Sequence, residues 1–257
     1  MQITPLSEGR RPVLVVSHER SGTHFTMNAA AKCFDYVSQP WIDVDRHQMN
    51  INYYAPQDLK EALTDVAQRR PANILKSHHE FAFFAEILDK VAAAYQLIYV
   101  YRHPADCLAS YWRLLNTLHW REGPRCATAL DFATTPPMGR LMRYQEHQYG
   151  TMLDRWANHV RGWVTAAEGR RDIHVLRYED LAGDYEAAIR ALGERLGQPP
   201  ERIERPSRHE NVVKAGSAPF APAPGADNRA AVAELALRTY PKLMARLGYG
   251  ESLAIAS

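Results

Sequence analysis

The chain has 257 residues, a composition typical of globular proteins and a formal net charge of +2. A chain of this length can bury a sizeable core, and we expect one α/β domain over residues 1–257. The nearly neutral charge argues against bulk nucleic-acid binding, the first residues lack the apolar region of a signal peptide, and no run reaches the roughly 18–20 apolar residues of a membrane span.

Four short apolar runs predict strands, in chain order Pro12 to Ser17, Asn73 to Ser77, Gln96 to Tyr101 and Ile173 to Arg177. Periodic segments predict helices over 23–34, 57–69, 80–94, 104–119, 139–168, 181–196 and 227–247. We expect irregular structure over 41–56, 121–137 and 206–226, which lack a period or are rich in Pro, Gly and Ser. Alternating strands and helices predict three layers, with a central, mostly parallel sheet flanked by helices.

The segment after the first strand has the features of an anion site. Its Gly22 lies in a tight turn that leads directly into a helix, whose first N–H groups and dipole favour phosphate. Ser21 and Thr23 would add hydroxyl donors, and Arg20 would add a planar cation. No Lys-Ser/Thr pair follows Gly22, so the segment departs from the Mg²⁺-holding P-loop pattern. A plain turn capped by Ser21 or Thr23 is the structural alternative.

The other predicted strands also end in polar residues, which would meet at the same edge of the sheet. Lys76 and His78 follow the second strand on one side of it, and could neutralise an oxyanion and accept a hydroxyl proton. Arg102 ends the third strand and could grip a phosphate, with Ser110 on the next helix as a further donor. Tyr178 ends the fourth strand and could pack against a purine.

Together these residues resemble the PAPS-dependent sulfotransferase family, in which PAPS is 3'-phosphoadenosine 5'-phosphosulfate. Five strings of the family occur in order between Val13 and Asp184. They are RSGTHF (Arg20 to Phe25), KSH (Lys76 to His78), R-x-P-x-D-x-x-x-S (Arg102 to Ser110), W-x-x-H-V-x-x-W (Trp156 to Trp163) and YEDL (Tyr178 to Leu181). The resemblance implies a P-loop-NTPase-like fold and transfer of a sulfuryl group from PAPS to a hydroxyl or amine, with release of PAP.

The resemblance also implies how the nucleotide is held. The residues implied for the 5'-phosphate and sulfate are Arg20, Ser21, Gly22, Thr23 and His24. Arg102 and Ser110 would bind the 3'-phosphate, while Phe25 and Tyr178 would line the adenine pocket. His24 and Phe25 depart from the usual hydroxyl residue and tryptophan. The late family segment that also grips the 3'-phosphate lacks a clean copy, and Lys214 and Gly216 are its best candidates, with Arg208 as second choice.

For catalysis, the resemblance implies that His78 is the general base and that Lys76 helps to stabilise the departing phosphate. Because charge grows on the leaving oxygen, we expect Arg20 to act with Lys76 in the transition state. His79, His18 and Glu19 are the alternative bases if His78 proves dispensable. There are two competing interpretations: a P-loop kinase that uses ATP and Mg²⁺, and a catalytically silent nucleotide-binding or scaffold protein. No metal is expected in the favoured interpretation.

The partners are less defined by the sequence. We expect a small-molecule, carbohydrate or lipid-linked acceptor facing residues 41–56 and 119–140, where Tyr53, Tyr54, Trp120 and Phe132 could line a pocket or simply be core. A homodimer is left open. The three cysteines are scattered and odd in number, so we expect buried free thiols and a cytoplasmic location.

Overall fold

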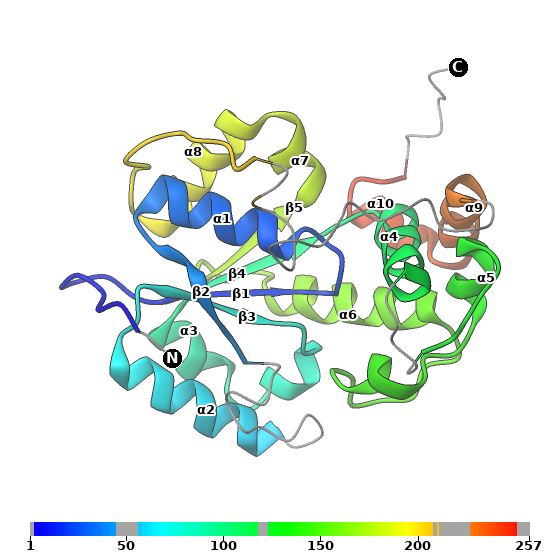
Figure 1. Cartoon of the computed structure of the whole chain (residues 1–257), viewed down its shortest axis with the longest axis horizontal. Helices are drawn as coiled ribbons and strands as arrows, with labels where there is room; N and C mark the ends of the chain where they lie inside the picture. Colours follow the sequence, from blue (N-terminus) through cyan, green and yellow to red (C-terminus); the bar gives the residue numbers. More distant parts are fainter. Residues whose placement is uncertain (1–2, 45–55, 118–122, 208–209, 211–226, 251–257) are drawn as a thin grey trace.

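The computed structural model describes residues 3–44, 56–117, 123–207, 210 and 227–250 (Figure 1). Within them, five parallel strands form one sheet in the order β2-β3-β1-β4-β5. The strands are β1 (Val13–Ser17), β2 (Val37–Asp43), β3 (Asn73–Ser77), β4 (Gln96–Tyr101) and β5 (Ile173–Arg177). The predicted α/β class is confirmed, and the four predicted strands occur with their predicted bounds, within one residue for β1.

The strand β2 was not predicted, and the expected irregular structure is wrong for Trp41–Asp43. This strand contains Pro40 among polar residues, a composition that an interior strand could not carry, since proline cannot donate to a ladder. It pairs only with β3 and lies at the edge of the sheet, where proline is tolerated. Residues 45–55 of the same predicted segment lie outside the described residues.

Four of the predicted helices are each divided in two, so the single long helices predicted there are wrong. Asp184 accepts a hydrogen bond from the Ala187 N–H and starts a new helix, and Thr151 does the same for Asp154. Pro241 begins the last helix and ends the one before it. The loop expected over 121–137 contains a short helix that begins with a capping box between Thr128 and Asp131.

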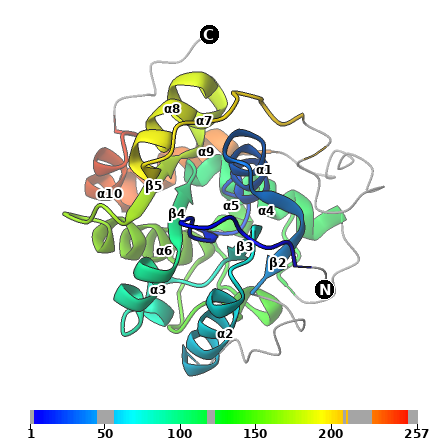
Figure 2. The ribbon, with the colours of Figure 1, turned by 90° about the vertical axis from the view of Figure 1, so that its left-hand side faces the viewer.

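The helices of the described residues are α1 (Thr23–Phe34), α2 (Pro56–Arg69), α3 (Leu88–Ala94), α4 (Pro104–Thr117), α5 (Ala129–Thr134), α6 (Met152–Ala166), α7 (Tyr178–Gly183), α8 (Tyr185–Leu196), α9 (Arg229–Thr239) and α10 (Pro241–Arg246), with short 3₁₀ helices η2 (Phe81–Phe84) and η3 (Gly139–Met142). The helices α1, α7 and α8 cover one face of the sheet, and α2 and α3 cover the other (Figures 1 and 2). Both faces are therefore buried, which explains why the strands read as continuous apolar runs.

The core has three parts, of which two are the faces of the sheet. Val13 and Val15 pack under α1 and α8, whereas Leu14 and Val16 point to the opposite face, under α2 and α3. The third part is a helical cluster formed by α4, α5, α6, α9 and α10. Phe132, one of the aromatics considered for an acceptor pocket, is fully buried in this cluster and is a core residue.

The helical cluster lies beyond the carboxyl ends of the strands (Figure 1). It therefore covers the edge at which the candidate residues were expected to meet. None of the helices in the described part of the chain is long and apolar enough to cross a membrane. Cys33 and Cys107 are buried, Cys126 is partly buried, and all three are free thiols, as predicted.

Candidate functional site

The segment between β1 and α1 forms a tight loop with an unusual backbone. Arg20 and Gly22 have positive φ angles of 69° and 98°, and the Ser21 N–H donates to the His18 carbonyl at 3.2 Å. Residues with positive φ are typical of anion nests, in which successive N–H groups can face a common point. A Cβ on Gly22 would lie 2.2 Å from a ring carbon of Tyr178, so only glycine allows this close approach.

Three strand ends bring their polar residues together at this loop. The Arg20 Nε donates to the Ser110 hydroxyl on α4 at 3.1 Å, which joins the ends of β1 and β4. The Arg102 guanidinium lies 4.5 Å from the ring centre of Tyr178 at the end of β5. The Arg102 Nε is buried and has no hydrogen-bond partner. The loop, α4 and α7 thus surround a cationic centre with an unsatisfied donor.

The positive charge of this centre affects the pKa of Arg20. Burial lowers that pKa, and the positive charges of Arg102 and Arg113 lower it further. Sequence reasoning did not single out Arg113, although it lies three residues after Ser110 and therefore on the same face of α4. The periodicity of that helix was the signal that could have found it.

The two hydroxyl groups of the loop are bonded within the protein. The Thr23 hydroxyl lies 2.6 Å from that of Ser17, and the Ser21 hydroxyl lies 3.6 Å from the Cys107 thiol. Both side chains are buried. In this structure their side chains therefore support the loop.

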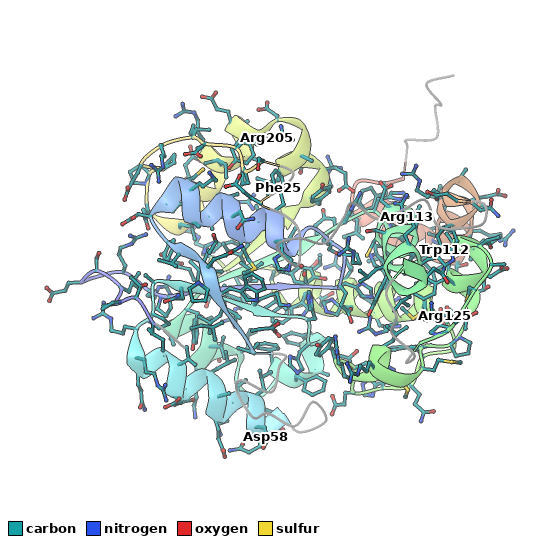
Figure 3. All side chains as sticks on the ribbon, viewed as in Figure 1. Phe25, Asp58, Trp112, Arg113, Arg125 and Arg205 are labelled. Atoms are coloured by element: carbon teal, nitrogen blue, oxygen red, sulfur yellow. The ribbon has the colours of Figure 1, made fainter. Side chains whose placement is uncertain are left out.

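The residues considered for the adenine pocket lie around the start of α1. The Phe25 ring centre is 6.0 Å from that of Tyr178, in an edge-to-face arrangement. The Arg205 guanidinium lies 5.7 Å from the Phe25 ring centre, and Figure 3 shows the two side chains close together where α1 meets α7 and α8. His24 packs edge-to-face on Trp41 of β2, at 5.0 Å between ring centres. The phenylalanine thus keeps the aromatic character that the resemblance requires at this position.

The imidazole of His78 is held in one orientation just after β3. Its Nδ1 lies 2.9 Å from the Ser17 carbonyl oxygen. Because a carbonyl oxygen only accepts, Nδ1 must carry the proton in the neutral ring, and Nε2 is then the basic nitrogen. The ring is at the end of the strand beside the anion loop, so the tautomer is the one that a general base needs.

Lys76 forms a buried ion pair that the sequence did not predict. Its Nζ lies 3.1 Å from a carboxylate oxygen of Asp43 at the end of β2, and both side chains are less than 10% exposed. An ammonium group has three donors, so the pair with Asp43 leaves it able to donate to a further oxygen. Asp43 was missed because β2 itself was missed.

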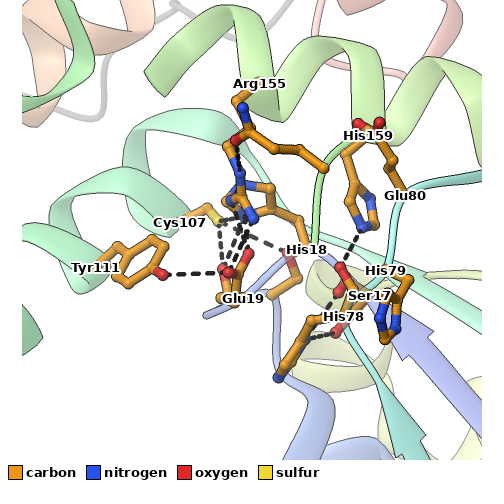
Figure 4. Close-up of polar contacts among 12 residues, drawn as sticks. Ser17, His18, Glu19, His78, His79, Glu80, Cys107, Tyr111, Arg155 and His159 are labelled. Atoms are coloured by element: carbon orange, nitrogen blue, oxygen red, sulfur yellow. Dashed lines mark hydrogen bonds and ion pairs between the residues drawn. The ribbon is translucent and has the colours of Figure 1, made fainter. Parts of the chain in front are cut away.

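The three alternative bases are engaged within the protein (Figure 4). The His79 Nδ1 lies 2.9 Å from the Ser77 hydroxyl. His18 bonds through Nδ1 to the Glu19 carbonyl and through Nε2 to Arg155, and burial lowers its pKa to about 4. Burial raises the pKa of Glu19, but the charge of Arg155 outweighs this and holds that pKa well below its usual value. The carboxylate of Glu19 therefore stays ionised and paired.

Several residues named from the sequence cannot be placed. Lys214 and Gly216, their alternative Arg208, and the aromatics Tyr53, Tyr54 and Trp120 lie outside the described residues. Arg125, in the expected acceptor region, donates to the Leu115 carbonyl at 2.8 Å. Among the described residues, no group of three or more His, Cys, Asp or Glu side chains is arranged to hold a metal ion.

Comparison with known proteins identifies the family of the chain. Residues 10–215 match the family described as "Sulfotransferase domain". The match covers well over half of the chain, which therefore belongs to the sulfotransferase domain family. Members of this family use PAPS as their donor. A search of curated protein sequences finds no match.

Solved structures of sulfotransferases resemble the chain in fold. A sulfotransferase from Alicyclobacillus acidocaldarius is 14% identical, with a TM-score of 0.50 over 93% of this chain and 96% of its own. Mouse sulfotransferase SULT7A1, solved in complex with PAP, is 15% identical, with a TM-score of 0.46 over 73% of this chain. The match spans 59% of the mouse protein's length. At such identities the likeness concerns the fold, which the bacterial structure supports over nearly the whole chain.

Proposed function

We propose that this protein is a sulfotransferase that moves a sulfuryl group from PAPS to a hydroxyl or amine of a small-molecule, carbohydrate or lipid acceptor, and releases PAP. One observation carries the proposal. In a chain of the sulfotransferase family, Arg20, Arg102 and Ser110 converge beside Tyr178 at the carboxyl edge of the sheet. Three separate strand ends contribute to this centre, as a nucleotide-binding edge of a parallel sheet requires.

The residues present fit a nucleotide phosphorylated at both ends of its ribose. The loop of Arg20 and Gly22, at the N-terminus of α1, offers N–H groups to a 5'-phosphosulfate. The buried Arg102 Nε lacks an acceptor, and a 3'-phosphate oxygen would supply one. The rings of Tyr178 and Phe25 lie 6.0 Å apart beside these groups, and a purine could pack against them.

The chemistry that PAPS supplies is an activated sulfuryl group on a good leaving group, the 5'-phosphate. We infer that His78 Nε2 accepts the proton of the acceptor hydroxyl while the Ser17 carbonyl holds the ring. The acceptor oxygen forms the new bond to sulfur in line with the bond that breaks, whose electron pair remains on the 5'-phosphate oxygen. Arg20, the loop N–H groups and Lys76 would stabilise the charge that grows on that oxygen.

Calorimetric titration of PAP, 5'-AMP and ATP–Mg²⁺ tests the donor assignment. We expect PAP to bind most tightly, and Arg102→Ala to lose about 10- to 100-fold of PAP affinity, the value of a hydrogen bond to a charged group. The loss for 5'-AMP should be much smaller, because it lacks the 3'-phosphate. Arg11→Ala is the matched control, since Arg11 donates to the Ala92 carbonyl and to Gln96 at the opposite edge of the sheet.

Equal losses for PAP and 5'-AMP would overturn the role of Arg102, and tighter binding of ATP–Mg²⁺ would favour a kinase. Incubation with PAPS and a panel of phenols, alcohols, sugars and lipid hydroxyls, read as a mass shift in the product, would identify the acceptor class. If PAP binds but no acceptor is modified, the catalytically silent alternative is supported.

A further inference from the structure

One helix contacts the ends of several strands through a single row of side chains. Arg155, His159 and Trp163 of α6 are four residues apart, so they lie along one face of the helix. All three side chains are almost fully buried. They belong to, or directly precede, the W-x-x-H-V-x-x-W string, for which the proposed chemistry gives no role.

The first member of the row holds the anion loop. Arg155 donates to both carboxylate oxygens of Glu19, at 2.8 and 2.9 Å, and its Nε donates to the Gln145 side chain at 3.0 Å. The Tyr111 hydroxyl donates to the same carboxylate at 3.2 Å (Figure 4). Glu19 directly precedes Arg20, whose φ is positive, so the bidentate pair ties this strained part of the loop to α6.

The second member holds the backbone that carries the proposed base. The His159 Nε2 lies 3.2 Å from the carbonyl oxygen of His78, and its Nδ1 lies 3.0 Å from the Tyr99 hydroxyl. The carbonyl can only accept, so Nε2 carries the proton and Nδ1 accepts from Tyr99. Burial keeps the pKa of His159 well below its usual value, so the ring stays neutral and in this tautomer.

The third member extends the same arrangement by one residue. The Trp163 Nε1 donates to the His79 carbonyl at 3.2 Å, and its ring stacks on Tyr99 of β4. One face of one helix therefore fixes the loop after β1 and the two residues after β3. These are the segments that carry Arg20 and His78.

We propose that Arg155 and His159 are positioning residues, which set the place of the His78 imidazole relative to the anion loop. The proposal rests on the sulfotransferase activity proposed above, because only then do these two segments form one reaction centre. A shift of about 1 Å in a reacting group can cost about 100-fold in rate, which is why a rigid element that spans both segments matters. Arg155 has a second effect, since it neutralises a buried carboxylate beside a site for anions.

Variants at His159 test the first role. His159→Leu removes the donor to the His78 carbonyl, and we expect kcat to fall by about 10- to 100-fold with little change in PAP affinity. His159→Gln keeps an N–H donor at a similar reach and should recover most of the rate. His174→Leu is the control, because His174 is also a buried histidine but contacts Gln96 at the far edge of the sheet.

A spectroscopic readout makes the test independent of the acceptor. In protein labelled with ¹⁵N-histidine, we expect the His78 ring signals, assigned with His78→Ala, to report the Nδ1–H tautomer. His159→Leu should shift these signals or mix the tautomers, and His174→Leu should leave them unchanged. If His159→Leu fails to fold, Tyr99→Phe provides a second test, because it removes the hydroxyl that donates to His159 Nδ1. This variant should change the His78 signals in the same way, but by a smaller amount.

Variants at Arg155 test the second role. Arg155→Met should weaken PAP binding by tenfold or more, because Glu19 is then an unpaired anion beside the site. The double variant Arg155→Met/Glu19→Gln removes both charges and should recover much of the affinity. A double variant as weak as the single one would overturn the electrostatic role of Arg155.

The two proposals can fail separately. If the wild-type protein does not bind PAP, but His159→Leu alters the His78 signals, the proposed donor is wrong and the positioning of His78 stands. If PAP binds normally and His159→Leu changes neither the His78 signals nor kcat, His159 is a core residue and the inference is wrong.

Discussion

The two edges of the sheet both carry partly buried arginines, but these arginines face opposite surroundings. At the amino-terminal edge, Arg10 donates to the carbonyls of Phe34 and Asp35, the last carbonyls of α1. At the carboxyl edge, Arg20 and Arg102 lie where α1, α4 and α7 begin. Helix C-termini present carbonyls, which accept hydrogen bonds from a cation. Helix N-termini present N–H groups, so both these groups and a nearby cation require an acceptor such as an anion.

The amino-terminal edge also contains a cavity of about 440 Å³, lined in part by Arg10, Arg11 and Gln96. Its cations donate to protein carbonyls and amides, as Arg11 does to Ala92 and Gln96. The carboxyl edge has the loop with positive φ at Arg20 and Gly22, at the N-terminus of α1. The Nε atoms of Arg10 and Arg102 are both buried without a hydrogen-bond partner, so an unsatisfied donor occurs at each edge. The comparison teaches that cations, empty volume and an unsatisfied donor do not define an anion site unless helix N-termini also lie there.

The largest expected effect is on the rate of sulfuryl transfer, and it distinguishes two histidines, one at each edge of the sheet. His78→Ala should reduce the rate of sulfuryl transfer by about 10² to 10⁴-fold, the usual contribution of a general base, with PAP affinity little changed. His174→Ala, a buried histidine of β5 whose ring contacts Gln96, should reduce stability and leave kcat unchanged. Steady-state kinetics with the acceptor from the panel checks both. Near-normal turnover of His78→Ala would move the base to another residue.

The next effect concerns stability as a function of pH. Burial lowers the pKa of His18 at the carboxyl edge and of His174 at the other, each to about 4. The unfolded chain binds these protons near pH 6.5, so stability is complete at neutral pH and is lost as pH falls from about 6.5 to about 4. As the pH falls from 7.5 to 5, each of these two histidines should lower the free energy of unfolding by about 2 kcal/mol.

Urea unfolding at these two pH values measures the loss. His174→Gln and His18→Gln should each remove their own share of the pH dependence, measured against the wild-type protein. A loss that neither substitution reduces would place the titrating groups elsewhere and would break the equivalence of the two edges in this respect.

The smallest effect compares two glycines with positive φ. In Gly22→Ala the new methyl group would meet the Tyr178 ring, and the loop would shift, so we expect PAP affinity to fall by about tenfold. Gly169→Ala, in the turn that leads into β5, has φ +71° and no other atom within 4 Å of the new Cβ. It should show backbone strain as reduced stability, with PAP affinity unchanged. Similar affinities in both variants would mean that Gly22 is needed only for folding.

Much of the fold and site could be predicted because the signals were local. The β1, β3, β4 and β5 strands are apolar runs, and the residues after each are placed at one edge by the parallel topology alone. The divided helices were missed because each hydrophobic period continues across the break, while a cap at Thr151 or Asp184 decides where a new helix starts. The edge strand β2 was missed for a tertiary reason, since only pairing with β3 makes it a strand.

The sequence by itself determined which residue types end each strand, and hence that Arg20, His78, Arg102 and Tyr178 share an edge. Only the tertiary structure decided their partners: Asp43 for Lys76, the Ser17 carbonyl for His78, and the contacts of α6. Glu19 and Arg155 are separated by 136 residues, and their pairing follows from how a helix packs across the strand ends. Strands and turns are determined by residues close together in the sequence, whereas the partner of a buried charge is determined by the packing of segments that are far apart in the sequence.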